Sequence, residues 1–193
     1  MIEYIKGEIT ELTPTYAVIE TSGIGYFINI SLPCYTALDN MTSAKLLIYE
    51  IIREDTHQLY GFLEQSERTL FELLIGVSGV GANTARMILS SIPVAELEQT
   101  IMNADSRRLK SVKGIGAKTA ERIIVDLKDK IKPSGSTLIL QAMPDSEIFD
   151  EALSAMVMLG FPRAAAQKVM KKIFEETPDI KVEAAIKKAL AMM

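Results

Sequence analysis

Two Gly-x-Gly motifs are the residues of this chain best suited to bind an anion. They read Ser78-Gly79-Val80-Gly81 and Lys113-Gly114-Ile115-Gly116, lie 35 residues apart, and each connects two segments with a helical pattern. Glycine can adopt a positive φ and allows another backbone to approach closely. The first turn of a helix has unpaired N–H groups at the positive end of its dipole. The motifs therefore indicate two phosphate sites that do not read bases.

Positive charge gathers around the second motif. Residues 107–132 hold nine basic and three acidic residues, a net charge of +6, although the whole chain carries −4. Such a patch attracts anionic partners whatever the net charge. Lys113 and Lys118 flank the second motif, whereas the first has Asn83 in place of Lys118, so we expect the second to bind more strongly. The alternative interpretation is two ordinary glycine helix caps.

Adjacent carboxylates, Glu54 and Asp55, lie in a predicted hairpin tip over residues 53–57. Charged turn residues are most often only solvated. Near DNA, however, two carboxylates would repel phosphates, push strands apart at a branch point and disfavour ordinary duplex. A metal site here is disfavoured because adjacent side chains on a strand point to opposite faces. We expect no special role for His57.

Composition favours a protein of a reducing cytoplasm. The chain has 193 residues, 48% of them hydrophobic, with one cysteine and one histidine. A single cysteine, Cys34, excludes an internal disulfide and multi-cysteine metal sites, and we expect it to be a buried apolar residue. No apolar run reaches the 18 residues of a membrane span, and no secretory signal is expected. We expect no cofactor.

The predicted fold is α+β with several domains. β-branched and aromatic segments alternate with turn residues over 1–63, which predicts about five short strands and a small barrel such as an OB-fold. A helical period follows over 64–131, with Ser66 as the expected N-cap of the first helix. The next four helices are predicted over residues 82–91, 94–104, 105–112 and 117–131.

A linker and a small helical domain complete the predicted organisation. Residues 132–144 contain proline, glycine and serine and predict a flexible linker. Residues 145–193 predict a UBA-like bundle of three helices, with Gly160 ending the first helix and Pro162 at the first position of the second. The methionines of this region indicate core packing, or else a partner surface near Met156, Met158, Leu159 and Phe161.

Taken together, these features resemble the RuvA family of bacterial Holliday junction proteins over the whole chain. An Arg-Glu-Asp tip precedes Leu59-Tyr60-Gly61-Phe62, the two glycine motifs follow, and Lys118-Thr119-Ala120-Glu121-Arg122 succeeds the second motif. The resemblance implies an OB-fold, tandem helix–hairpin–helix motifs and a tethered third domain. It identifies Glu54 and Asp55 with an acidic pin at the junction centre. The DNA-binding residues it implies are Gly79, Val80, Gly81, Asn83, Lys113, Gly114, Ile115, Gly116, Lys118 and Arg122.

The resemblance also implies a function and partners. It implies binding of four-way junctions regardless of sequence, in recombination and DNA repair, by a homotetramer or by an octamer on DNA. A RuvB-type hexameric ATPase would be recruited through the third domain, where Leu159, Gly160 and Phe161 match the loop region. A RuvC-type junction resolvase is a further partner. The chain itself is expected to be non-catalytic, and it has no Gly-x-x-x-x-Gly-Lys-Ser/Thr motif.

Two alternatives from other functional classes remain. A helix–hairpin–helix repair glycosylase or nuclease shares the hairpin but needs a catalytic Lys/Asp pair or a metal site. Lys118 with Asp126, or Glu54 with Asp55, are the candidates for such a site. The second alternative is a protein-interaction adaptor built around the C-terminal bundle, which the basic stretch over residues 107–132 disfavours.

Overall fold

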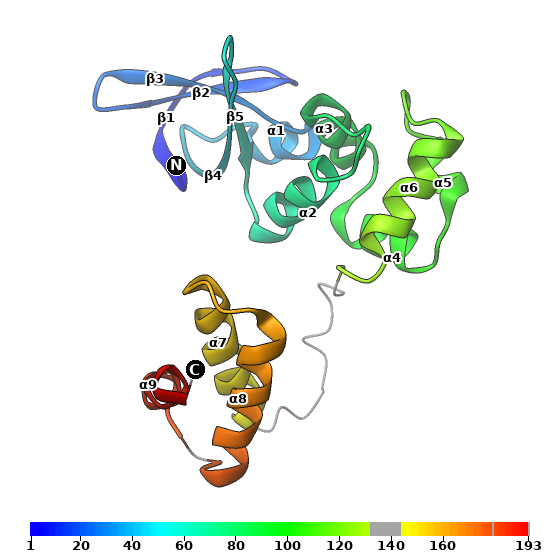
Figure 1. Cartoon of the computed structure of the whole chain (residues 1–193). Helices are drawn as coiled ribbons and strands as arrows, with labels where there is room; N and C mark the ends of the chain where they lie inside the picture. The colour runs from blue at the N-terminus through cyan, green and yellow to red at the C-terminus, as the bar shows by residue number, and fades with distance from the viewer. Residues whose placement is uncertain (132–143, 179, 193) are drawn as a thin grey trace. The chain divides into compact units, whose positions relative to one another are not determined.

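The computed structural model describes residues 1–131, 144–178 and 180–192. The chain divides into two compact units (Figure 1). One contains a barrel and helices α1–α6, and the other contains helices α7–α9. The linker predicted over 132–144 lies outside the described residues except for Pro144, which begins α7.

Five strands close into a barrel at the N-terminus, as the sequence predicted. The strand order around the barrel is β1-β2-β3-β5-β4. Four neighbouring pairs are antiparallel, and β3 closes the barrel against β5 in parallel, with Ile28 opposite Leu59. The strands span Tyr4–Leu12 (β1), Tyr16–Thr21 (β2), Ile24–Asn29 (β3), Ser43–Ile52 (β4) and His57–Phe62 (β5).

A short helix, α1 (Leu32–Leu38), connects β3 to β4 and was missed by the sequence analysis. The Ser31 side chain caps it by accepting a hydrogen bond of 3.3 Å from the Cys34 N–H. Cys34 is buried, as predicted, and its burial raises the pKa of the thiol to about 12. The β2–β3 turn is tight: Ser22 and Gly23 adopt positive φ, and β3 begins directly after them at Ile24.

Five helices follow the barrel in the first unit. Helix α2 is capped by Glu64 in a capping box with Glu67, so the predicted N-cap at Ser66 was wrong. Helix α3 has the predicted bounds, whereas the three helices after it end earlier than predicted. The helices span Gln65–Ile75 (α2), Ala82–Ser91 (α3), Val94–Met102 (α4), Ser106–Lys110 (α5) and Ala117–Leu127 (α6).

Strand β5 is buried on both faces, and the helices join the barrel there. Leu59 packs in the barrel core, whereas Tyr60 and Phe62 belong to the helical core. The Phe71 ring on α2 lies 5.0 Å from the rings of Tyr60 and Phe62 and 5.6 Å from that of Tyr49 on β4. These centroid distances suit favourable aromatic pairing. One aromatic cluster therefore holds the barrel and α2 together.

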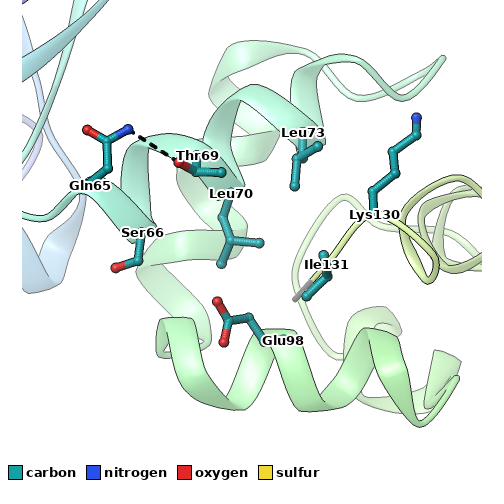
Figure 2. Close-up of a pocket in the computed structure, with 8 residues that line it drawn as sticks. All are labelled: Gln65, Ser66, Thr69, Leu70, Leu73, Glu98, Lys130 and Ile131. Atoms are coloured by element: carbon teal, nitrogen blue, oxygen red, sulfur yellow. Dashed lines mark hydrogen bonds between the residues drawn. The ribbon is translucent and has the colours of Figure 1, made fainter. Parts of the chain in front are cut away.

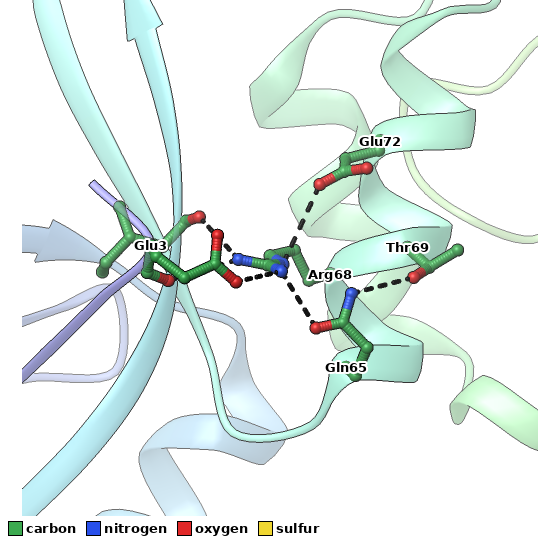
Figure 3. Close-up of polar contacts among 6 residues, drawn as sticks. Glu3, Gln65, Arg68, Thr69 and Glu72 are labelled. Atoms are coloured by element: carbon green, nitrogen blue, oxygen red, sulfur yellow. Dashed lines mark hydrogen bonds and ion pairs between the residues drawn. The ribbon is translucent and has the colours of Figure 1, made fainter. Parts of the chain in front are cut away.

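Arg68 makes a second connection between α2 and the barrel (Figure 3). Its Nη2 donates to the Glu3 carboxylate at 2.6 Å, and its Nη1 donates to the carbonyls of Glu3 at 3.2 Å and Ile48 at 3.4 Å. The hydrogen bond from this guanidinium lowers the pKa of the Glu3 carboxyl. The polar contacts of Arg68 and the packing of Phe71 thus both hold α2 against the barrel.

The second unit is a bundle of three helices, α7 (Pro144–Met158), α8 (Arg163–Glu176) and α9 (Val182–Met192). Gly160 ends the α7 region with φ +95°, as expected, whereas Pro162 is the N-cap of α8 and not its first residue. Within the described ranges, no helix is long and apolar enough to cross a membrane. The buried core of the bundle is Ala152, Leu153, Met156, Ala166, Met170, Ile173, Ala185 and Ala189.

Phe71→Ala should lower the free energy of unfolding of the full chain by about 3–5 kcal/mol, because it opens a cavity between barrel and helices. Urea unfolding followed by circular dichroism measures this change. Val125→Ala, at a position 76% exposed on α6, is the matched control and should change stability little. A loss below about 1 kcal/mol for Phe71→Ala would contradict this account of the barrel–helix contact.

Candidate nucleic-acid interface

The two Gly-x-Gly motifs form hairpins of the same geometry. The first glycines, Gly79 and Gly114, have φ of +91° and +90°, a backbone conformation that residues other than glycine rarely adopt. The second glycines are the N-caps of α3 and α6 and are extended, with φ/ψ of −87°/171° at Gly81 and −80°/169° at Gly116. Each hairpin therefore turns the chain at its first glycine and starts a helix at its second.

The residue between the two glycines anchors each hairpin. Val80 and Ile115 are buried, and their N–H groups donate to the carbonyls of Val77 at 3.0 Å and Val112 at 3.1 Å. Both residues were among the predicted DNA contacts, yet their side chains and N–H groups face the protein. These two N–H groups are therefore already paired within the protein and are not free to donate to a phosphate.

Helices α3 and α6 begin with uncovered N–H groups. Neither Gly81 nor Gly116 has a side chain that could cap its helix, and both are exposed. A Cβ atom built on either glycine would meet no atom within 4 Å. The first N–H groups of a helix have no intrahelical acceptor, so these donors can bind an external anion.

Cationic side chains accompany both hairpins. Lys113 and Lys118 are exposed at the second hairpin, and Asn83 is exposed at the first. Arg122 of α6 reaches across to the first hairpin, where its Nη1 donates to the carbonyl of Ser78 at 3.2 Å and to the Ser78 Oγ at 3.0 Å. This contact places a positive charge beside the first hairpin. The sequence had predicted less positive charge there, because Asn83 replaces the lysine found at the second hairpin.

The acidic tip closes the β4–β5 hairpin. The Arg53 N–H donates to the Thr56 carbonyl at 2.8 Å, and Glu54 and Asp55 between them are exposed. Over the residues that the structure describes, neither carboxylate has a hydrogen-bond or salt-bridge partner. Both negative charges are thus available to repel phosphates close to the tip.

Comparison with known proteins agrees with this geometry. Family models match the RuvA N terminal domain over residues 1–61, the SAM-like helix-hairpin-helix tandem over 71–129 and the RuvA C-terminal domain over 147–193. The chain belongs to the RuvA family. The resemblance inferred from the sequence is therefore confirmed, as is the predicted fold class.

Curated RuvA relatives align over nearly their whole length. A protein of Parabacteroides distasonis is 54% identical over all of both chains, and one of Bacteroides fragilis is 52% identical over 98% of both. A protein of Porphyromonas gingivalis is 48% identical, again over the full length of both chains. All three are described as Holliday junction branch migration complex subunit RuvA.

A contact at the base of this RuvA tip was not anticipated from the sequence. The Nε2 of His57, the first residue of β5, lies 2.7 Å from the Glu50 Oε1 on β4, and the Ile2 N–H donates to the same carboxylate at 3.2 Å. The hydrogen bond with His57 lowers the pKa of Glu50. His57 thus braces the two strands that carry the tip, although no role was expected for it.

The residues suggested for an enzymatic site do not come together in this RuvA chain. Lys118 and Asp126 are eight residues apart on α6, a rise of about 12 Å. A pocket between α2 and α4 contains neither of them and neither tip carboxylate; Figure 2 shows Lys130 at its rim directed away from the buried Glu98. Within the described ranges, no group of three or more side chains is arranged to hold a metal ion.

The C-terminal unit exposes an apolar patch at the end of α7. Met158 is 88% and Leu159 59% exposed, whereas Phe161 is half-buried against the bundle core. Met156, which the sequence analysis considered for the same surface, is fully buried in the core of the bundle. Of the three predicted partner contacts, Leu159 offers its side chain to solvent, Gly160 makes the turn, and Phe161 packs mainly inward.

Serine substitutions should distinguish the first glycine of each hairpin, which makes the turn, from the second, which is the N-cap of the helix. Gly114→Ser forces a side chain into a left-handed conformation and should lower the free energy of unfolding by about 1–3 kcal/mol. Gly116→Ser should be neutral or slightly stabilising, because serine is a preferred N-cap. Urea unfolding compares the pair, and Gly79→Ser with Gly81→Ser should repeat the pattern. Equal losses at Gly114 and Gly116 would show that backbone conformation does not distinguish the two positions.

Proposed function

We propose that this protein binds four-way DNA junctions without sequence preference, holds them open and acts as the non-catalytic DNA-binding subunit of a branch migration complex. The observation that carries the proposal is the pair of equivalent hairpins, each opening an uncapped helix N-terminus, in one unit with an exposed acidic tip. Membership of the RuvA family, whose relatives are described as branch migration subunits, supports it.

The hairpins would supply affinity. N–H groups at the start of α3 and α6 would bind phosphate oxygens of a duplex arm, with Lys113, Lys118 and Arg122 adding charge. Asn83 would contribute a neutral donor at the first hairpin. Phosphates are identical along DNA, so this grip carries no sequence information. The side chain of Val80 or Ile115 would hold its hairpin in shape from within the core.

The tip would supply preference for a junction. Glu54 and Asp55 carry two negative charges, and a continuous duplex lying across them would bring its phosphates close to both. An open junction has a gap between its arms at the crossover, so the same charges cost it less. Preference of this kind arises from a penalty on the wrong ligand and not from extra contacts to the right one.

Assembly of several subunits would allow all four DNA arms of the junction to be bound. We infer a homotetramer, or an octamer on DNA, in which each subunit holds one arm with its two hairpins. The exposed patch of Met158 and Leu159, with the Gly160 turn and Phe161, would recruit a RuvB-type hexameric ATPase that supplies the motor activity. A RuvC-type resolvase would act on the same junction. These inferences rest on the RuvA resemblance.

A repair glycosylase or nuclease is the weaker proposal. Its candidate residues on α6 are about 12 Å apart along the helix axis, and the tip carboxylates are open to solvent. No cleavage of a junction or of damaged duplex is expected from the purified chain.

The central test is a comparison of a labelled four-way junction with a linear duplex of the same length. We expect tighter binding of the junction and a loss of affinity for both with salt, because lysines and arginines release counterions. Gel shifts or fluorescence anisotropy at several salt concentrations measure both. Equal affinity for the two DNAs in the wild-type protein would refute the proposed function.

Gly81→Ser with Gly116→Ser should weaken binding of both DNAs by about tenfold or more in the same assay. The new hydroxyl can accept from the helix N–H groups and compete with the phosphate, while the fold is preserved.

Neutralising the tip with Glu54→Gln and Asp55→Asn should tighten binding to linear duplex by several-fold and leave junction binding unchanged or slightly tighter. Removing two negative charges removes the repulsion that disfavours duplex. Glu8→Gln with Glu20→Gln is the matched control, since these exposed residues face each other across β1 and β2 and carry the same charge. Loss of junction binding in the tip variant, or an equal gain in the control, would show that the tip does not act by local repulsion.

A further inference from the structure

A hollow separates the acidic tip from the first hairpin. Its walls are formed by Arg53, Thr56 and Gln58 at the base of the tip and by residues 81–84 at the start of α3. Side-chain packing does not fill this space. The separation of tip and hairpin must therefore be fixed by contacts beside the hollow.

Arg86 on α3 makes such a contact. It lies one turn after Asn83, and its Nη1 donates to the Thr15 carbonyl at 2.7 Å and to the Asn29 Oδ1 at 3.4 Å. Thr15 belongs to the turn between β1 and β2, and Asn29 ends β3. A charged donor thus connects the helix of the first hairpin to two places on the barrel.

The contact continues to the strand that carries the tip. The Asn29 side-chain amide donates to the Leu59 carbonyl of β5 at 3.1 Å, and β5 begins at His57, two residues after Asp55. A second contact lies one turn further along α3, where the Ser90 Oγ accepts from the Leu32 N–H at 3.1 Å. One face of α3 is therefore held at two successive turns, to the barrel by Arg86 and to the start of α1 by Ser90.

We propose that Arg86 is a positioning residue for junction recognition, which fixes the distance between the acidic tip and the first hairpin. The inference rests on the proposed function. Electrostatic repulsion falls with distance, so the tip penalises a duplex only if it stays close to the DNA held by the hairpin. Without Arg86, α3 keeps its apolar packing and the Ser90 contact but loses its charged contact with the barrel beside the hollow. The distance from the first hairpin to the tip then varies more, and the tip penalises a duplex less.

A direct phosphate contact by Arg86 makes different predictions. A residue that neutralises a phosphate weakens binding to junction and duplex alike, and its loss reduces the slope of log affinity against log salt by about 0.9. A positioning residue changes the ratio of the two affinities and leaves the duplex slope unchanged.

The experiment measures dissociation constants of the full chain for a four-way junction and for a linear duplex of the same length at several salt concentrations. Arg86→Ala should reduce the junction preference about tenfold, with duplex affinity and salt slope nearly unchanged. Arg86→Lys should restore part of the preference, since an ammonium can donate to the Thr15 carbonyl. Arg163→Ala removes the same charge from an exposed position of the other unit and should behave as wild type.

Two results would overturn the proposal. One is an unchanged junction preference in Arg86→Ala, and the other is equal weakening of both DNAs with a reduced salt slope. Circular dichroism melting verifies folding. Asn29→Ala removes one of the two acceptors of Arg86 and the link to the Leu59 carbonyl, so it must shift the preference in the same direction by a smaller amount. A wild-type protein without junction preference would contradict the proposed function itself, whereas retained preference in both variants contradicts only the role of Arg86.

Discussion

The packing of Phe71 between the barrel and the helices is the interaction on which the rest of the molecule depends. Its ring meets Tyr49, Tyr60 and Phe62, which alternate with barrel-core residues along β4 and β5. The same two strands end in the acidic tip. A single cluster therefore links the strands that carry the acidic tip to the helices that carry the two glycine hairpins. In the proposed mechanism, discrimination between DNA shapes depends on this link.

Internal repetition explains why the hairpins are equivalent. Residues 35 positions apart share their burial as well as their type, since Leu74 and Leu109 are fully buried, as are Ala85 and Ala120. The first glycines of the two motifs, Gly79 and Gly114, repeat φ within 1°. The repeat is incomplete at the surface, because Lys118 follows the second motif at the position that Asn83 occupies after the first. Arg122 partly compensates by crossing from the second hairpin to Ser78 in the first, so the two sites share charge that belongs to one helix.

Features set by local sequence could be predicted, whereas those set by distant contacts could not. The glycine turns, the tip between β4 and β5 and most strand positions follow from residue types a few positions apart. Helix α1 was missed because its seven residues lie between strands, and Ser66 was chosen as a cap because the Glu64–Glu67 capping box begins with an uncommon residue. Arg68 and Arg86 reach Glu3 and Thr15, which lie 65 and 71 residues away, and no local pattern connects these pairs.

Recognition by shape places an unusual demand on a protein. A base-reading site selects through hydrogen bonds, each of which has its own partner on a base edge. A site that combines uniform attraction with local repulsion has no such partners, and its selectivity is a difference between two energies that both vary with distance. Charged contacts made to backbone carbonyls, as by Arg68 to Glu3 and Ile48 and by Arg86 to Thr15, suit this demand because the acceptors cannot change rotamer. In the proposed mechanism, the polar connections between barrel and helices therefore matter as much as the groups that would face the DNA.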